Sequence, residues 1–286
     1  MTDILNLGST REQFINDLKK KGRSNSTILA YNKDVSQLIE FVTKDKVSFP
    51  QDITAEHIEA FKASLTTNNY TAKSISRKLN SIKTFCRFLI SHDLIKDNPT
   101  TNITHPKYEI KPPRILSKME YRSLRDVCRE DIRLYAIIEI LLQTGIRIGE
   151  LANLSLNDID TNKLDIKPFE SHTQRDVPLN KPAQTALASY LTIRPKSRSN
   201  QVFITKTGKP FLIRNIRTAI DRYFKIADIK NAKVNDLRHT FIAHQLQSGT
   251  PLTLISKLVG HKRLSTTEKY LDIVTPNPGP ETLEEL

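Results

Sequence analysis

Cysteine is scarce in this chain of 286 residues, which holds only Cys86 and Cys128. The two lie far apart and belong to no Cys-X-X-Cys pair or mixed Cys/His cluster. A disulfide framework and a zinc site of ordinary spacing are therefore both excluded. We predict two reduced, semi-buried cysteines that fill space, and no metal site.

Long hydrophobic runs are also missing. Nowhere do about eighteen apolar residues follow one another, as a membrane-spanning helix would require. The first residues lack the basic start and apolar centre of a secretory signal. No internal repeat or low-complexity segment interrupts the chain. We expect a cytoplasmic protein without a membrane partner.

Acidic residues are in deficit, with 31 Asp and Glu against 44 Lys and Arg, a net charge of +13. This excess favours an acidic polymer such as DNA as the partner. The length suggests two domains. Residues 98–113 are rich in proline and polar side chains and read as a connector. We expect a first domain at 1–105, a linker at 106–116, a second domain at 117–273 and an acidic tail at 274–286.

The first domain shows helical periodicity throughout. In its most informative helix, which Thr71 caps and which extends to residue 93, six apolar residues share an arc of roughly 120°: Ile75, Leu79, Ile82, Phe85, Cys86 and Leu89. A second stripe is basic and carries no interleaved acid: Lys73, Arg77, Lys83 and Arg87. Such a stripe is either a solvated face or a surface that contacts DNA phosphates. We take phosphate contact as the hypothesis to test.

The second domain mixes helices with short β-prone segments. Residues 118–130 form an amphipathic pattern, and 132–142 are apolar nearly all round, which predicts a buried central helix ending at Gly145. Further helices are expected at 183–191 and 213–227. A small antiparallel sheet is predicted from three segments, 163–169, 176–179 and 202–204. The fold class is mainly α (α+β).

Three short helices are expected between Val234 and Ile273. The first ends at Ser248-Gly249, and Thr250 is expected to cap the second, with Pro251 at its first position. Gly260 ends that second helix, immediately before His261. These start and stop signals place Arg238 within the first helix and His261 just beyond the end of the second.

The third helix carries the tyrosine. Ser265 and Glu268 form a capping-box pattern that opens it, and Tyr270 falls in its first turns. A single tyrosine on a helix, or a single Gly-His pair, is usually structural. The combination with an upstream arginine motif is much more specific.

Two separated motifs together carry a family resemblance. Arg238-His239-Thr240, then Gly260-His261, then Tyr270 resembles the signature of the tyrosine recombinase (phage integrase) family, and residues 144–151, Thr-Gly-Ile-Arg-Ile-Gly-Glu-Leu, resemble its first arginine box. The resemblance implies a helical N-terminal core-binding domain and a mostly helical catalytic domain with a small antiparallel sheet. It also implies a site-specific DNA recombinase of integrase or resolvase type. Such an enzyme would act without a cofactor, as a homodimer on each recombination site and a tetramer in the synapse.

The expected chemistry assigns a role to each matching residue. Tyr270 would attack phosphorus and form a 3′-phosphotyrosyl intermediate. Arg147 and Arg238 would hold the charge of the transition state with their guanidinium forks. His261 would bond a phosphate oxygen or steady the tyrosine, and Glu150 would orient groups in the site.

This chain departs from the family pattern at two positions. Asn235 stands where a histidine is usual, and an amide can donate a hydrogen bond but cannot shuttle a proton. The usual place of the catalytic lysine falls near Glu170, so we expect Lys167 to protonate the leaving 5′-oxygen if the hairpin is longer. His239 is expected to be structural, and Arg175 to contact the DNA backbone.

Two other functions remain open from the sequence. Residues 251–270 could form a helix-turn-helix of a non-catalytic DNA-binding protein, with Leu264 to Tyr270 in the groove. A type IB topoisomerase would use the same chemistry to relax DNA. The tail at 274–286 is either disordered or, as the resemblance suggests, a segment that docks on a neighbouring protomer.

Overall fold

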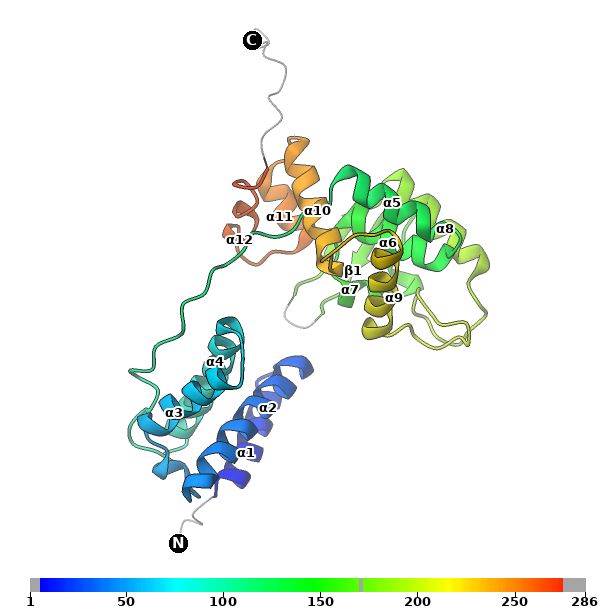
Figure 1. Cartoon of the computed structure of the whole chain (residues 1–286). Coiled ribbons are helices and arrows are strands. Elements are labelled where there is room, and N and C mark those ends of the chain that lie inside the picture. Colours follow the sequence, from blue (N-terminus) through cyan, green and yellow to red (C-terminus); the bar gives the residue numbers. More distant parts are fainter. Residues whose placement is uncertain (1–5, 170–171, 275–286) are drawn as a thin grey trace. The chain divides into compact units, whose positions relative to one another are not determined.

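The computed structural model describes residues 6–169 and 172–274. The chain divides into two compact units, Met1–Ile110 and Lys111–Leu286 (Figure 1). The division falls inside the proline-rich segment that the sequence marks as a connector. The tail beyond residue 274, with its expected docking role, lies outside the described residues.

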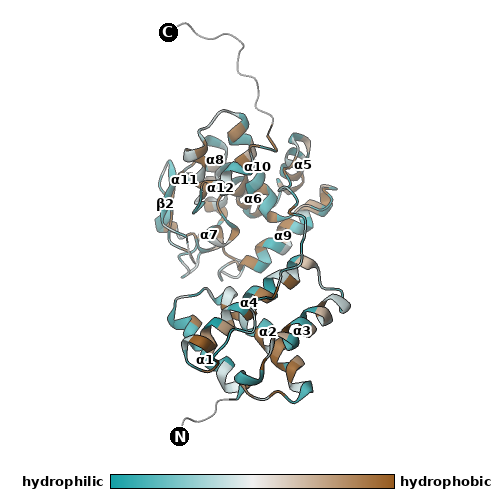
Figure 2. Ribbon diagram, turned by 90° about the vertical axis from the view of Figure 1, so that its left-hand side faces the viewer, coloured by the Kyte–Doolittle hydropathy of each residue, from teal (hydrophilic) through white to brown (hydrophobic). Residues whose placement is uncertain are grey.

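The first unit is a bundle of four helices: α1 (Leu7–Lys20), α2 (Asn25–Val42), α3 (Ala55–Thr67) and α4 (Ala72–Ser91). Each begins after a polar residue whose side chain accepts a hydrogen bond from a backbone N–H of the first turn. These capping residues are Asn6, Ser24, Thr54 and Thr71. Two short 3₁₀ turns, Thr43–Asp45 and Pro50–Asp52, connect α2 to α3. The apolar sides of the helices face one another and form one core (Figure 2).

Helix α4 confirms the predicted apolar face, since all six residues of that face are buried. The four residues of its basic stripe differ in their contacts. Lys73, Arg77 and Arg87 are all exposed, but Arg77 pairs with Asp34 of α2. The half-buried Lys83 donates from its ammonium group to the Ile103 carbonyl at 2.9 Å. Part of the stripe therefore contributes to the fold of this unit.

Asp34 is the polar centre of the first unit. Its side chain is 1% exposed and accepts from Arg77 at 3.0 Å, from Lys78 at 2.9 Å and from Ser81 at 2.7 Å. Burial raises the pKa of this carboxyl, but these donors outweigh it and hold the pKa below its ordinary value. The interaction ties α2 to α4.

The second unit is built around one apolar helix. Helix α6 (Ile132–Thr144) contacts α5 (Lys118–Cys128), α7 (Ile148–Asn153), α8 (Lys181–Ile193), α9 (Ile213–Ile226) and α10 (Val234–Gln247). Its Ala136, Ile137, Ile138 and Ile140 are fully buried. The predicted central helix is confirmed, including its end at Gly145, whose φ of 62° places it in the left-handed region.

The sheet is smaller than predicted. Strands β1 (Lys163–Ile166) and β2 (Arg175–Pro178) pair antiparallel, with Leu164 opposite Val177, and a 3₁₀ turn, Leu156–Asp158, precedes them. The expected third strand at 202–204 is wrong. Its three apolar residues are buried in the core, and only single bridges form there, such as Ile204 with Pro210. A short run of apolar residues is compatible with a buried loop as well as with a strand.

Helices α11 (Leu252–Val259) and α12 (Ser265–Glu268) follow α10 and pack against each other. The stop at Ser248-Gly249 is confirmed, but two predicted caps are wrong. Pro251 takes the cap position of α11 while Thr250 bonds Gln245, and Leu264 precedes α12 without a side-chain cap.

The short α12 also removes the helix-turn-helix alternative. The helix spans only four residues, and Tyr270 follows it in a turn rather than lying within it. A groove-reading element needs several successive side chains on one exposed helical face. This segment does not supply them.

Both cysteines are free and fully buried, so they are more deeply buried than predicted. Burial raises the pKa of the Cys86 and Cys128 thiols to about 12.

In the part of the chain that the structure describes, no helix combines the length and apolar character needed to cross a bilayer.

Candidate active site

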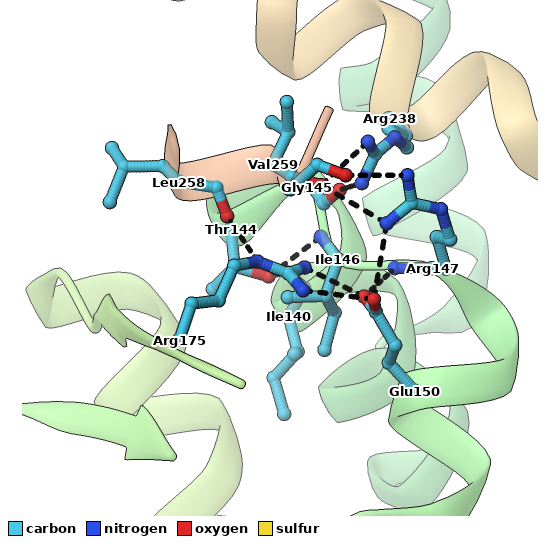
Figure 3. Close-up of polar contacts among 11 residues, drawn as sticks. Ile140, Thr144, Gly145, Ile146, Arg147, Glu150, Arg175, Arg238, Leu258 and Val259 are labelled. Atoms are coloured by element: carbon cyan, nitrogen blue, oxygen red, sulfur yellow. Dashed lines mark hydrogen bonds and ion pairs between the residues drawn. The ribbon is translucent and has the colours of Figure 1, made fainter. Parts of the chain in front are cut away.

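Three arginines from separate parts of the chain gather in one region, and two of them bond the same glutamate (Figure 3). Glu150, whose side chain is fully buried, accepts both arms of the Arg175 guanidinium at 2.9 and 2.7 Å and one arm of Arg147 at 3.1 Å. It also accepts the backbone N–H of Arg147 at 2.8 Å, which caps the start of α7. Burial raises the pKa of Glu150, but these donors outweigh it and lower the pKa overall. The carboxylate therefore fixes two arginines in place.

Arg175 was expected to contact DNA, and the structure corrects this. Its side chain is 7% exposed, its fork is occupied by Glu150, and its Nε donates to the Leu258 carbonyl at 2.6 Å. It thus joins β2 to α7 and α11. Its partners are 25 and 83 residues away in sequence, so no local pattern could have revealed this position.

Arg238 lies deeper, at 7% exposure. It donates to the Gly145 carbonyl at 2.5 Å and to the Val259 carbonyl at 2.7 Å. Arg147 donates to that same Val259 carbonyl at 3.2 Å and to Gly260 at 2.9 Å. The two predicted phosphate-binding arginines therefore meet at the carboxyl end of α11, whose partial negative charge favours cations.

Arg238 has no carboxylate partner among the residues that the structure describes, and burial lowers its pKa to about 9. Its hydrogen bonds go to two carbonyl groups, and Glu150 acts on its charge only from a longer range. A buried charge without a counter-ion is unfavourable. An anion bound beside Arg147 and Arg238 would remove that penalty.

His261 follows directly from the left-handed turn at Gly260, whose φ is 68°. Its ring Nδ1 lies 2.8 Å from the Thr267 hydroxyl. Burial, together with Arg238 and Arg147, lowers the pKa of His261 to about 3. The ring is therefore neutral at physiological pH. Beside it, a cavity of about 610 Å³ is lined by residues that include His172, Arg175, Gly260 and Lys262.

Tyr270 is 5% exposed and packs with Ile242, Ile255 and Val259. Its hydroxyl lies 2.6 Å from Nδ1 of His239. Burial raises the pKa of this phenol, and the charge of Arg238 partly offsets the rise. His239 was expected to be structural, yet it is the residue that contacts the predicted nucleophile.

The residues at the two departures from the family pattern, Asn235 and Lys167, form no hydrogen bond with this cluster in the described part of the chain. Asn235 is exposed near the start of α10. Lys167 follows β1 with 56% of its side chain exposed and pairs with Asp165, and its ammonium lies 3.8 Å from an Asp158 oxygen. The hydrogen bond that Lys167 donates to Asp165 raises the pKa of Lys167. Glu170, at the usual lysine position, lies outside the described residues.

His172 is a neighbour that the sequence did not indicate. Burial and the charge of Arg147 lower the pKa of its ring. It reaches the site because the hairpin closes through a single bridge between Phe169 and His172. No motif marks it, since only the hairpin's length decides which side chain faces the cavity.

Comparison with known proteins identifies the family. The model of the phage integrase family matches residues 114–275, and that of the N-terminal SAM-like domain of phage integrases matches residues 12–93. The tyrosine recombinase XerD of Rickettsia bellii (strain RML369-C) is 32% identical over 286 residues, covering 90% of this chain and 92% of the relative. XerC of Leptospira interrogans (strain Fiocruz L1-130) is 32% identical over 279 residues, covering 93% and 89%.

Solved structures agree with this assignment. The crystal structure of XerA recombinase matches with a TM-score of 0.53 and 28% identity, covering 92% of each chain. A lambda integrase dimer bound to a COC′ core site shares the fold, with a TM-score of 0.77, 16% identity, and coverage of 98% and 80%.

The chain belongs to the phage integrase family. Its relatives are tyrosine recombinases, which cut and rejoin DNA strands at specific sites through a tyrosine. This chain is accordingly a site-specific recombinase of the tyrosine type, similar to XerC and XerD.

Proposed function

We propose that Tyr270 is the nucleophile of this recombinase and that Arg147 and Arg238 hold the scissile phosphate. The supporting observation is the balance of charge in the site, where Glu150 bonds the guanidinium groups of Arg147 and Arg175 and leaves Arg238 with carbonyl partners alone. A phosphodiester bound at the carboxyl end of α11 would compensate this excess. Planar guanidinium forks match phosphate oxygens in a bidentate manner.

His261 would complete the phosphate site as a neutral donor. When Nδ1 accepts the Thr267 hydroxyl, the proton of the ring lies on Nε2, which can then donate to a nonbridging oxygen. Glu150 would act by holding Arg147 and Arg175 in position rather than by touching DNA. Asn235, exposed at the start of α10, would donate a hydrogen bond from its amide to the phosphate or its neighbour.

We assign the protonation of the leaving 5′-oxygen to Lys167, which would exchange its pair with Asp165 for the DNA. A substrate with sulfur at the bridging 5′ position tests this assignment, because a thiolate leaves without a proton. Lys167→Ala should slow cleavage of ordinary DNA by about 10²- to 10⁴-fold and leave the sulfur substrate nearly unaffected. Equal losses on both substrates would remove Lys167 from this role and favour His172.

The central experiment traps the covalent intermediate. On a nicked duplex carrying the recombination site, the wild-type protein should accumulate an adduct at the 3′-phosphate, because the short leaving strand diffuses away. Tyr270→Phe should bind the same duplex with unchanged affinity and form no adduct. Tyr223→Phe, on α9, is the matched control and should react normally.

An adduct that persists in Tyr270→Phe would disprove this nucleophile. Mapping the adduct by peptide mass analysis would then identify the residue actually used.

We further propose that two copies occupy each recombination site and four assemble in the synapse. Lambda integrase has been crystallised as a DNA-bound dimer and as a tetramer on a Holliday junction. In this chain, Lys73 and Arg87 of α4 would contact the DNA backbone, as would Arg77 and Lys83 to the extent that DNA displaces their present partners. We place this activity in the cytoplasm, where chromosomal and mobile DNA are accessible.

A further inference from the structure

The hydrogen bond between Tyr270 and His239 joins two elements that the chain separates by 31 residues. His239 lies on α10 directly after Arg238, and Tyr270 follows α12. The two rings are 5.8 Å apart between centroids and tilted by 41°, so the contact is made by Nδ1 and the hydroxyl rather than by stacking. The bond is short, at 2.6 Å.

The surroundings of this pair keep the imidazole neutral. Burial lowers the pKa of His239, the carboxylate of Asp236 raises it, and the charge of Arg238 lowers it again. His261 is the other titratable ring nearby, and its own pKa is about 3. A neutral imidazole with a bare Nδ1 is a proton acceptor.

From this geometry, and resting on the proposed role of Tyr270, we propose that His239 is the catalytic base of the cleavage step and accepts the phenolic proton of Tyr270 at Nδ1. Tyrosine requires such help because its ordinary pKa is about 10 and burial raises it further. Among the described residues, no other proton acceptor forms a hydrogen bond with the hydroxyl.

The residues that would otherwise take the proton are unsuited to it. Asn235 carries an amide and cannot accept a proton at neutral pH. His261 is occupied at Nδ1 by Thr267 and is a weaker base. His239 therefore supplies the proton acceptor that Asn235 cannot provide.

The step is a transesterification, and its atoms balance. The Tyr270 oxygen forms a bond to phosphorus, the bond from phosphorus to the 5′-oxygen breaks, and the Tyr270 proton moves to His239. The leaving 5′-oxygen takes a proton from Lys167 or water. In the rejoining step the 5′-hydroxyl attacks phosphorus and gives its proton back to Lys167 or water. The bond from phosphorus to the Tyr270 oxygen breaks, and His239 returns its proton to Tyr270.

The test is single-turnover cleavage of the nicked duplex between about pH 5 and pH 9, with DNA affinity measured in parallel. The wild-type rate should be on a plateau wherever His239 is unprotonated, with any fall confined to the acid end of the range. His239→Asn should be slower by about 10²- to 10⁴-fold and should lack that plateau, its rate climbing toward the pKa of the tyrosine itself. His244→Asn, an exposed histidine on the same helix, should match the wild type.

Two results would overturn the proposal. One is a His239→Asn protein that binds DNA normally and cleaves within about threefold of the wild type with the same pH profile. The other needs no variant and is therefore independent of folding: a wild-type rate that keeps climbing up to pH 9 and reaches no plateau. A failure of the proposed function would look different, because adducts would then persist in Tyr270→Phe.

Discussion

Glu150 is the residue on which the geometry of the site depends. It is buried, it carries a negative charge, and its partners are two arginines and a backbone N–H at the start of α7. Removing one member of a buried ion pair leaves the other charge desolvated and unpaired, which typically costs about 3–5 kcal/mol. The same substitution releases Arg147, a proposed phosphate ligand.

Glu150→Ala should therefore lower the free energy of unfolding of the second unit by about 3–5 kcal/mol, measured by urea denaturation followed by circular dichroism. Asp126→Ala is the control, because it removes an exposed pair with Arg129 and should cost less than about 1 kcal/mol. Adding Arg175→Leu to Glu150→Ala should restore part of the loss, since the orphaned charge is then gone. Equal losses of unfolding free energy in Glu150→Ala and Asp126→Ala would show that the buried cluster stabilises the fold no more than an exposed ion pair does.

The same carboxylate predicts an acid limit for stability. The pKa of Glu150 is lower in the folded protein than its ordinary value of 4.5. Its stabilising contribution is therefore fully present above pH 4.5 and is lost as the pH falls through the lower folded value. The free energy of unfolding should fall more steeply with acid below pH 4.5 in the wild type than in Glu150→Ala.

At the scale of elements, the turn between α6 and α7 decides where Arg147 and Arg238, the proposed phosphate ligands, point. Gly145 ends α6 with φ at 62°, and its carbonyl accepts from Arg238. A Cβ on this residue would press into the ring of Phe241 on α10, closer than van der Waals contact. Glycine is required here both for its conformation and for its size.

Gly145→Ala should cost about 2–4 kcal/mol of stability, from the left-handed backbone and from overpacking against Phe241. It should also slow cleavage, because the Gly145 carbonyl that accepts a hydrogen bond from Arg238 would shift. Gly249→Ala is the matched control: its φ is 76°, but no atom lies within 4 Å of the added carbon. It should show only the backbone cost of about 1–2 kcal/mol. Equal costs in the two variants by urea denaturation would rule out a steric role for Phe241.

These elements also show what sequence patterns can and cannot predict. The buried α6 and the inner face of α4 were predictable because their periodicity is local and strong. The third strand and the cap at Ser265 were wrong, because short apolar runs and four-residue motifs fit several structures. The pairs of Arg175 with Glu150 and of His239 with Tyr270 join residues far apart in the chain, and no local signal marks them.

At the scale of the whole molecule, the net charge of +13 complements the negative charge of DNA. Each protein cation that neutralises a phosphate releases condensed counter-ions, so affinity falls with salt at a slope set by the number of phosphates neutralised. The structure separates the basic stripe of α4 into two classes. Lys73 and Arg87 are exposed and form no ion pair in the described part of the chain, whereas Arg77, although exposed, is paired with the buried Asp34.

Replacing Lys73 and Arg87 together by alanine should therefore reduce the slope of log affinity against log salt by about 0.9 for each phosphate that is no longer neutralised, or nearly two units in all. Lys20→Ala with Lys44→Ala removes the same charge from exposed positions outside α4 and should leave the slope nearly unchanged. Binding of a fluorescent duplex, titrated at several salt concentrations, measures both slopes. If the two double variants reduce the slope equally, attraction depends only on net charge, and α4 does not lie against the phosphates.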